Sequence, residues 1–230
     1  MVTAVISCHN EHERVGAVLD VVTKANMVDE VMVVDDGSTD GTAQLVADLY
    51  PSVTLVRHET NHGKAAAMCT GVERMKGDIV VFIDADLQNL KVEHIDNLVR
   101  PVVDGSADMS VMLRGNAPFL YRKVFHSDPA ISGERCLRKA DFLEIRQHHP
   151  ELPTVHYAIE VIINDYFIYL KKNVVVVVAP GVDQFYKEQK EGFIKGFEKN
   201  LKMTTNILRN IGVRKYLQQL SVYSHIPVKE

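Results

Sequence analysis

The chain has 230 residues, of which 46% are hydrophobic and 24% are charged, a balance typical of a folded globular protein and not of a disordered one. Its formal net charge of -4 provides no field that would attract nucleic acid, so we expect no nucleic-acid partner. The longest apolar run, residues 174–180, is far shorter than the roughly 20 residues that a membrane-spanning helix needs. We therefore expect no transmembrane segment.

The cysteines and the first residues indicate the compartment. Cys8, Cys69 and Cys136 are odd in number and form no CxxC pair, a pattern that fits reduced thiols better than a disulfide framework. Met1 leads directly into an apolar run without a basic segment, so we expect no signal peptide. Both observations favour a cytoplasmic protein.

The first half alternates short β-branched runs with amphipathic stretches. In chain order we expect strands over 2–7, 31–35, 53–57, 79–84 and 109–113, and helices over 14–25, 42–50, 64–75 and 92–103. Short connections between alternating strands and helices predict a mainly parallel sheet with right-handed crossovers. The length suits one α/β domain.

The second half is less regular. Residues 116–128 are mixed, 131–138 are expected to form a short strand that passes the crevice, 139–147 and 157–171 look helical, and 174–179 form a strand rich in Val. From residue 188 onward, apolar residues recur at spacings of three and four and predict a long amphipathic helix. The stripe consists of Phe193, Ile194, Phe197, Leu201, Thr204, Leu208 and Ile211. The stripe would pack in the core or in a dimer contact. Because Lys195, Lys199 and Lys202 lie on the same helix, a membrane-surface contact, and thus a peripheral membrane location, also stays open.

Two predicted strands end in paired carboxylates. Asp35 and Asp36 follow one apolar run, and Asp84 and Asp86 follow another. Burying such groups without partners costs several kcal/mol, so they belong at the carboxyl ends of their strands. In an open parallel sheet these ends share one crevice, where ligands bind. We therefore expect a divalent cation and a ligand that carries negative charge.

Alternation along an extended chain would place Asp84, Asp86 and Gln88 on one side, where they could hold Mg²⁺ or Mn²⁺ while diphosphate oxygens complete the coordination shell. The alternative is that the two carboxylates are turn or N-cap residues before the next helix. Two common nucleotide signatures are absent. No G-x-G-x-x-G follows the first strand, and although residues 62–64 resemble part of a phosphate loop, position 58 is His instead of Gly and Ala65 cannot supply the metal-binding hydroxyl.

Five motifs agree in order and spacing with a known family. They are Asn10-Glu11, Val33-Val-Asp-Asp-Gly-Ser-Thr-Asp-Gly-Thr42, Asn61-His-Gly-Lys-Ala65, Gly77-Asp-Ile-Val-Val-Phe-Ile-Asp-Ala-Asp-Leu-Gln88 and Ser132-Gly-Glu-Arg-Cys-Leu-Arg138. Over residues 2–180 the chain resembles the family 2 glycosyltransferases of GT-A fold, and among these the polyprenol-phosphate (dolichol-phosphate) mannosyl- and glucosyltransferases.

The resemblance implies an inverting transfer of a hexose from a GDP- or UDP-sugar to a phosphate-bearing acceptor such as a polyprenyl phosphate, with Mg²⁺ or Mn²⁺ as cofactor. It implies a nucleotide-sugar-binding half over 1–115, an acceptor half over 116–182 and a helical extension over 183–230. The nucleotide-sugar site would comprise Ser7, His9, Glu11, Val34, Asp36, Lys64, Asp84, Ala85 and Asp86. Asp86 and Gln88 would ligate the metal, and Arg114 would lie near the phosphates as a catalytic residue with Asp86.

This chain departs from the family in two places. Residues 7–11 read Ser-Cys-His-Asn-Glu where the family usually has Pro-Ala-Tyr-Asn-Glu, so His9 replaces an aromatic residue at the base site and the nucleotide stays open. Members that act on lipid carriers often add membrane helices after this domain, and this sequence shows none, which argues against a deeply membrane-bound acceptor.

The acceptor decides whether a base is needed. A phosphate monoester has a second pKa of about 6 and needs no strong base, and Arg114, Arg122, Arg135 and Arg138 could receive it. A hydroxyl acceptor needs a general base, for which Glu134 and Glu160 are the candidates. Equally, Arg135 and Arg138 could pair with surface acids and Glu160 could be a solvated helix residue.

Three other functions stay open. They are transfer to a soluble hydroxyl acceptor, a catalytically silent nucleotide-sugar-binding or scaffold protein, and a sugar-phosphate nucleotidyltransferase, although the last expects a Gly-rich loop that residues 7–10 do not provide. A homo-oligomer is also compatible with the apolar stripe.

Overall fold

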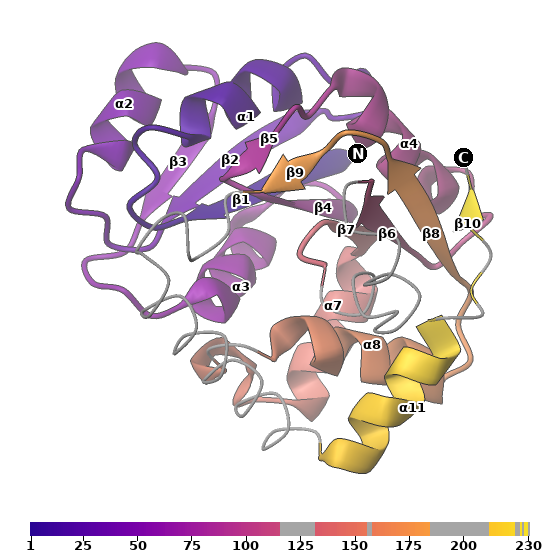
Figure 1. The fold of residues 1–230 in the computed structure, drawn as a ribbon. Coiled ribbons are helices and arrows are strands. Elements are labelled where there is room, and N and C mark those ends of the chain that lie inside the picture. Colours follow the sequence, from indigo (N-terminus) through magenta and orange to yellow (C-terminus); the bar gives the residue numbers. More distant parts are fainter. Residues whose placement is uncertain (116–131, 156–157, 185–211, 224–225, 227, 230) are drawn as a thin grey trace, which may run out of the picture.

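A computed structural model describes residues 1–115, 132–155, 158–184, 212–223, 226 and 228–229 (Figure 1). Its centre is an eight-stranded sheet with the order β10-β8-β6-β7-β4-β1-β2-β3. These strands are β1 Val2–Cys8, β2 Glu30–Asp35, β3 Thr54–Arg57, β4 Ile79–Asp84, β6 Met109–Arg114, β7 Arg135–Arg138, β8 Val174–Ala179 and β10 Val228–Lys229. β7 runs antiparallel to β4 and β6, and all other neighbours in this sheet are parallel.

Helices cover both faces of the sheet. One face packs against α1 Val15–Val22, α2 Thr42–Leu49 and α4 Val92–Val103, and the other against α3 Lys64–Arg74, α7 Lys139–His148 and α8 Ile159–Tyr169. The helix α11 Val213–Tyr223 lies across α8 on the outer side of the second layer (Figure 1). A single 3₁₀ turn, Leu152–Thr154, precedes α8.

The central strands are apolar on both sides because both faces are covered. In β1, Val5 belongs to the core beneath α3 and α8, while Ala4 and Ile6 belong to the core beneath α1 and α4. This explains why these strands are nearly continuous hydrophobic runs instead of alternating ones.

A small second sheet lies beyond the end of β4. Its strands β5 Leu87–Gln88 and β9 Asp183–Gln184 are antiparallel, with Gln88 opposite Asp183. Leu87 is buried in the core beneath α1 and α4, so Gln88, the other residue of β5, faces away from that core. This pair anchors the segment that carries Asp86.

The predicted α/β architecture is confirmed, with differences in detail. The strand expected over 131–138 is shorter, since only β7 pairs, and the sequence pattern did not reveal β5, β9, β10 or α11. The long helix expected from residue 188 to 211 and the mixed segment 116–128 lie outside the described residues. No helix among the described residues is long and apolar enough to cross a membrane.

Candidate functional site

The two acidic strand ends lie at the same edge of the sheet. β1 lies between β2 and β4, and Ser7 is paired with Val34 on one side and with Asp84 on the other. One residue further along, Cys8 is paired with Asp35. The expectation that the acidic ends of β2 and β4 share one edge is therefore confirmed.

Five charged side chains gather next to this edge, at the ends of β4 and β6 and the beginnings of β7, α3 and α8. We call them the charge cluster, and they are Lys64, Asp84, Arg114, Glu134 and Glu160. The Lys64 Nζ lies 2.7 Å from Asp84 Oδ1 and 3.0 Å from Glu160 Oε1. Arg114 Nη1 lies 3.4 Å from Glu134 Oε1, and the Ser132 hydroxyl donates a hydrogen bond of 2.8 Å to Glu134 Oε2. The cluster thus joins predicted donor-side and acceptor-side residues in one network.

Burial and neighbouring charges shift the pKa values of the cluster residues in different directions. Burial on its own would raise the pKa of Asp84, but the Lys64 ammonium, together with the Arg114 guanidinium and a hydrogen bond with Glu134, holds that pKa below its ordinary value. Glu134 is fully buried, and the burial raises its pKa in spite of the opposing Arg114 guanidinium. Burial would lower the pKa of Lys64, yet Asp84 and Glu160 raise it above its usual range. At neutral pH, Lys64 and Asp84 therefore form a charged pair.

Gly133 allows this pair to lie directly against the backbone. A Cβ atom at Gly133 would lie 2.5 Å from Lys64 Nζ and 2.6 Å from Asp84 Oδ2, closer than such atoms approach one another. The Ser-Gly-Glu order of residues 132–134 therefore has a steric reason: any side chain at the middle position would displace the ion pair.

Asp36 organises the loop that precedes α3. Its carboxylate accepts hydrogen bonds from the backbone N–H groups of His62, at 3.0 Å, and of Gly63, at 2.7 Å. It also bonds His58 Nδ1 at 2.7 Å. Because Lys64 follows this loop directly, Asp36 fixes where α3 begins and where the Lys64 side chain starts.

The remaining residues of the expected nucleotide site follow β1, β2 and β4. His9 Nδ1 bonds the carbonyl oxygen of Asp36 at 2.8 Å, and Glu11 pairs with Arg14. Val34 and Ala85 are buried, with 0% and 4% of their surface exposed, so both contribute to the wall of the site more than to direct contacts.

The expected acceptor arginines lie in different environments. Arg135 is fully buried. Arg138 lies opposite Ile79, the first residue of β4, and thus at the other end of that strand from the acidic edge. Arg122 lies outside the described residues. Since Arg135 is fully buried and Arg138 lies at the other end of β4, only Arg114 of the described arginines is carried into the acceptor site proposed below.

Two of the three expected metal ligands are suited to a hard cation. Asp86, 7% exposed in the turn before β5, and Gln88 in β5 supply oxygen donors, and β9 places Asp183 opposite Gln88. Asp84, in contrast, is already neutralised by Lys64. Among the described residues, no three His, Cys, Asp or Glu side chains form a group that could hold a metal ion, so a cation at Asp86 would need ligand oxygens as well.

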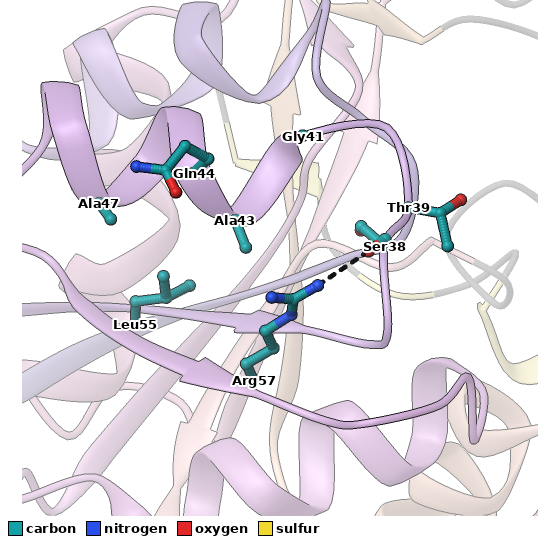
Figure 2. A pocket seen from close by; sticks show the side chains of 8 residues that line it. All are labelled: Ser38, Thr39, Gly41, Ala43, Gln44, Ala47, Leu55 and Arg57. Carbon is teal, nitrogen blue, oxygen red and sulfur yellow. Dashed lines mark hydrogen bonds between the residues drawn. The ribbon is translucent and has the colours of Figure 1, made fainter.

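A shallow hollow of about 280 Å³ lies elsewhere, between α2 and β3 (Figure 2). Ser38, Thr39, Gln44 and Arg57 line it together with small apolar side chains, and Arg57 Nη2 donates to the Ser38 carbonyl oxygen at 3.2 Å. None of the expected site residues lines this hollow, so we assign it no part in the chemistry.

The fold and the acidic edge are those expected of a GT-A glycosyltransferase, and comparison with known proteins identifies the family. The family model described as "Glycosyl transferase family 2" matches residues 3–174. The chain belongs to this family, which confirms the glycosyltransferase resemblance.

The curated relatives have a common printed name, undecaprenyl-phosphate 4-deoxy-4-formamido-L-arabinose transferase. The protein from Aeromonas hydrophila is 35% identical over 132 residues, which are 54% of this chain and 40% of the relative. The protein from Pseudomonas fluorescens is 37% identical over 123 residues, 50% of this chain and 36% of the relative. The matched region thus spans about two fifths of the length of these relatives.

Solved structures confirm the GT-A fold. Glucosyl-3-phosphoglycerate synthase from Mycobacterium tuberculosis, in complex with Mn²⁺, UDP and glucosyl-3-phosphoglycerate, matches with a TM-score of 0.69 and 20% identity. The match covers 99% of this chain and 81% of that one. The same enzyme with Mg²⁺ and UDP gives a TM-score of 0.68.

Sequence reasoning missed several residues of this arrangement. Gly133, Ser132 and His58 contact charged members of the site, and Asp183 lies opposite Gln88, yet none of the four was singled out. The Ser-Gly-Glu motif contained a signal for the first two, since a glycine beside a buried acid indicates a close approach. No local signal could have paired residue 183 with residue 88.

Proposed function

We propose that the chain transfers a hexose, with inversion and with a divalent metal, from a nucleoside-diphosphate sugar to a phosphate-bearing acceptor such as a polyprenyl phosphate. The observation that carries the proposal is the charge cluster at the shared edge of β1, β2 and β4. The names of the relatives support a polyprenyl-phosphate acceptor, and the Mn²⁺, Mg²⁺ and UDP of the solved structures support a metal and a uridine donor.

The donor would lie along the edge from β2 to β4. In the proposal, Ser7, His9, Glu11 and Asp36 shape the base and ribose site, with the buried Val34 beside them. Asp84 and Ala85 would contact the ribose and diphosphate, and Lys64 would supply positive charge. This assignment explains why Asp36 holds the loop that leads into Lys64.

The metal would be held by Asp86 and Gln88, together with oxygen atoms of the donor diphosphate. Cleavage of the glycosyl-phosphate bond develops negative charge on the leaving diphosphate, which a bound Mg²⁺ or Mn²⁺ would stabilise as a Lewis acid. Asp84 would lie beside the metal and not ligate it, because its charge is balanced by Lys64.

The engaged state of both candidate bases favours a phosphate acceptor over a hydroxyl acceptor. Glu160 is held by Lys64, and Glu134 is buried between Arg114 and Ser132. An ionised phosphate attacks without a base, and Arg114 at the end of β6 would bind its charge. Arg122 stays a prediction for the same site.

A peripheral contact with a membrane fits such an acceptor. On α11, Val213 and Leu217 are each 58% exposed and Arg214 is exposed beside them, while Lys215 pairs with Asp165 on α8 at 2.8 Å. An exposed apolar pair next to a basic residue suits the surface of an anionic bilayer. We propose a cytoplasmic chain with this face at the membrane.

The test is sugar transfer from UDP- or GDP-hexoses to a short-chain polyprenyl phosphate, with and without Mn²⁺. We expect metal-dependent product with the wild type and a loss of at least about 100-fold in Asp86→Asn, since several kcal/mol of charge stabilisation would be lost. Asp48→Asn on the exposed side of α2 is the matched control and should keep full activity. Product with a hydroxyl acceptor alone would select the soluble-acceptor alternative, and no turnover with any donor would select the silent binding protein.

A further inference from the structure

Arg135 is the largest fully buried side chain among the described residues. Its guanidinium donates to the carbonyl oxygen of Ser132, to the carbonyl oxygen of Glu160 at 3.1 Å and to Asn164 Oδ1 at 3.1 Å. Its Nε has no hydrogen-bond partner in the described part of the chain. Arginine stays protonated in proteins, so a buried cation is held here by neutral oxygens, an arrangement that burial makes costly.

The first two contacts of Arg135 hold the backbone at both carboxylates of the acceptor side. Ser132 bonds the Glu134 carboxylate through its hydroxyl, while its carbonyl oxygen is bound by Arg135. Glu160 bonds Lys64 through its carboxylate, while its carbonyl oxygen is bound by Arg135. One planar guanidinium therefore fixes the distance between the segment that carries Glu134 and the first turn of α8.

The third contact connects Arg135 with the C-terminal helix. Asn164 Oδ1 also accepts a hydrogen bond of 2.5 Å from the Tyr223 hydroxyl, and Asn164 Nδ2 donates to Gln219 Oε1 at 3.4 Å. Gln219 Nε2 in turn donates to the Val161 carbonyl oxygen at 2.8 Å. Gln219 and Tyr223, both on α11, are 1% and 4% exposed. Two buried polar side chains of α11 are thus inserted into the network of Arg135.

We propose that Arg135 is a positioning residue for the charge cluster and that α11, through Tyr223, Gln219 and Asn164, is part of the catalytic unit. This inference rests on the proposed function. The relay runs from α11 to Asn164, then to Arg135, and then to the backbone of Ser132 and Glu160. It connects the helix whose exposed side carries Val213 and Leu217 with the reacting edge through Asn164 and Arg135.

Tyr223→Phe is the principal test, because it removes a single hydroxyl and keeps the buried ring. We expect kcat for sugar transfer to fall about 5- to 10-fold, since small misplacements of active-site groups reduce rates steeply, while KM for the donor stays within about twofold. Arg135→Lys removes the planar fork and should lower kcat by about 100-fold. Tyr166→Phe on α8 is the matched control: its hydroxyl bonds Glu144 at 2.8 Å on the side of α7, away from Arg135, and kcat should not change.

A second readout separates this inference from the proposed function. Hydrogen–deuterium exchange of the backbone amides of residues 132–138 and 159–165 should be faster in Tyr223→Phe than in the wild type, and unchanged in Tyr166→Phe. If the wild type has no transferase activity but Tyr223→Phe shows the faster exchange, the proposed function is wrong and the relay stands. Wild-type kcat together with wild-type exchange in Tyr223→Phe would overturn the inference, whether or not Arg135→Lys folds.

Discussion

Lys64 Nζ and Asp84 Oδ1 lie 2.7 Å apart, which joins the first residue of α3 to the last residue of β4. Lys64 reaches Glu160 on α8 as well, so one ammonium group connects the sheet with that helix. Since Asp84 is neutralised in this way, the acidic edge can receive a diphosphate without the full repulsion of its carboxylates.

Replacing Lys64 by Met should destabilise the protein by about 2–3 kcal/mol at pH 7, because it leaves Asp84 and Glu160 without their cation. The value lies below that of a fully buried pair since 32% of the Lys64 side chain is exposed. Urea unfolding measures it. Lys91→Met, at a largely exposed pair with Glu93, is the control and should change stability by no more than about 0.5 kcal/mol.

This loss should depend on pH in a defined direction. The pKa of Asp84 is lowered in the folded protein, so its stabilising contribution is present above its ordinary value of 3.8 and is lost as the pH falls through the lowered value. In Lys64→Met the unpaired carboxylates take up protons more readily. The difference in unfolding free energy between the two proteins should therefore shrink from pH 7 towards pH 4, and a difference that grows would contradict the pairing.

Gly133→Ala should damage the site more than the fold. The added Cβ would meet Lys64 Nζ at 2.5 Å and Asp84 Oδ2 at 2.6 Å, so the ion pair must move. We expect kcat/KM for sugar transfer to fall by about 10- to 100-fold, as for other small displacements of reacting groups. Gly16→Ala in α1, whose Cβ would only touch the Tyr50 hydroxyl oxygen at 3.4 Å, should keep its activity. Equal activity of the two variants would refute the steric role of Gly133.

The three thiols should be inert in the native protein. Burial raises the pKa of Cys69 to about 11 and raises the pKa values of Cys8 and Cys136 above their usual range. A disulfide reagent such as DTNB at pH 8 should thus react only as fast as the protein unfolds, and all three thiols should react in concentrated urea. Rapid modification of the native protein would show that at least one of them is accessible.

The sequence patterns predicted the strands and the shared acidic edge because both follow from burial. Carboxylates that end an apolar run need partners or solvent, so they belong at the strand ends, where Asp35 pairs with Arg57 and Asp84 pairs with Lys64. The partners of these carboxylates could not be predicted, because Lys64 lies 20 residues before Asp84 in the sequence and meets it only in the folded protein. Arg135 and Arg138 looked equally suited to the acceptor site from the sequence. The structure, however, buries Arg135 inside the protein, and the pairing of β7 with β4 places Arg138 at the end of β4 away from the acidic edge.

The C-terminal part shows the limit of periodicity. Gln219 and Tyr223 are polar residues of a short helix, and nothing in their spacing indicates that both are buried against Asn164. β10, with two residues, is too short to give a pattern, although it extends the sheet beside β8.

The central claim is tested most directly by calorimetric titration of UDP with and without Mn²⁺. The titration compares the wild type with Asp86→Asn and Asp48→Asn. The claim is that the edge formed by β1, β2 and β4 holds a metal-bound nucleoside diphosphate. We predict that Mn²⁺ strengthens UDP binding at least about tenfold, a gain of about 1.4 kcal/mol, in the wild type and in Asp48→Asn but not in Asp86→Asn. The claim would be contradicted if the affinity of the wild type for UDP did not depend on Mn²⁺, or if Mn²⁺ strengthened UDP binding by Asp86→Asn as well.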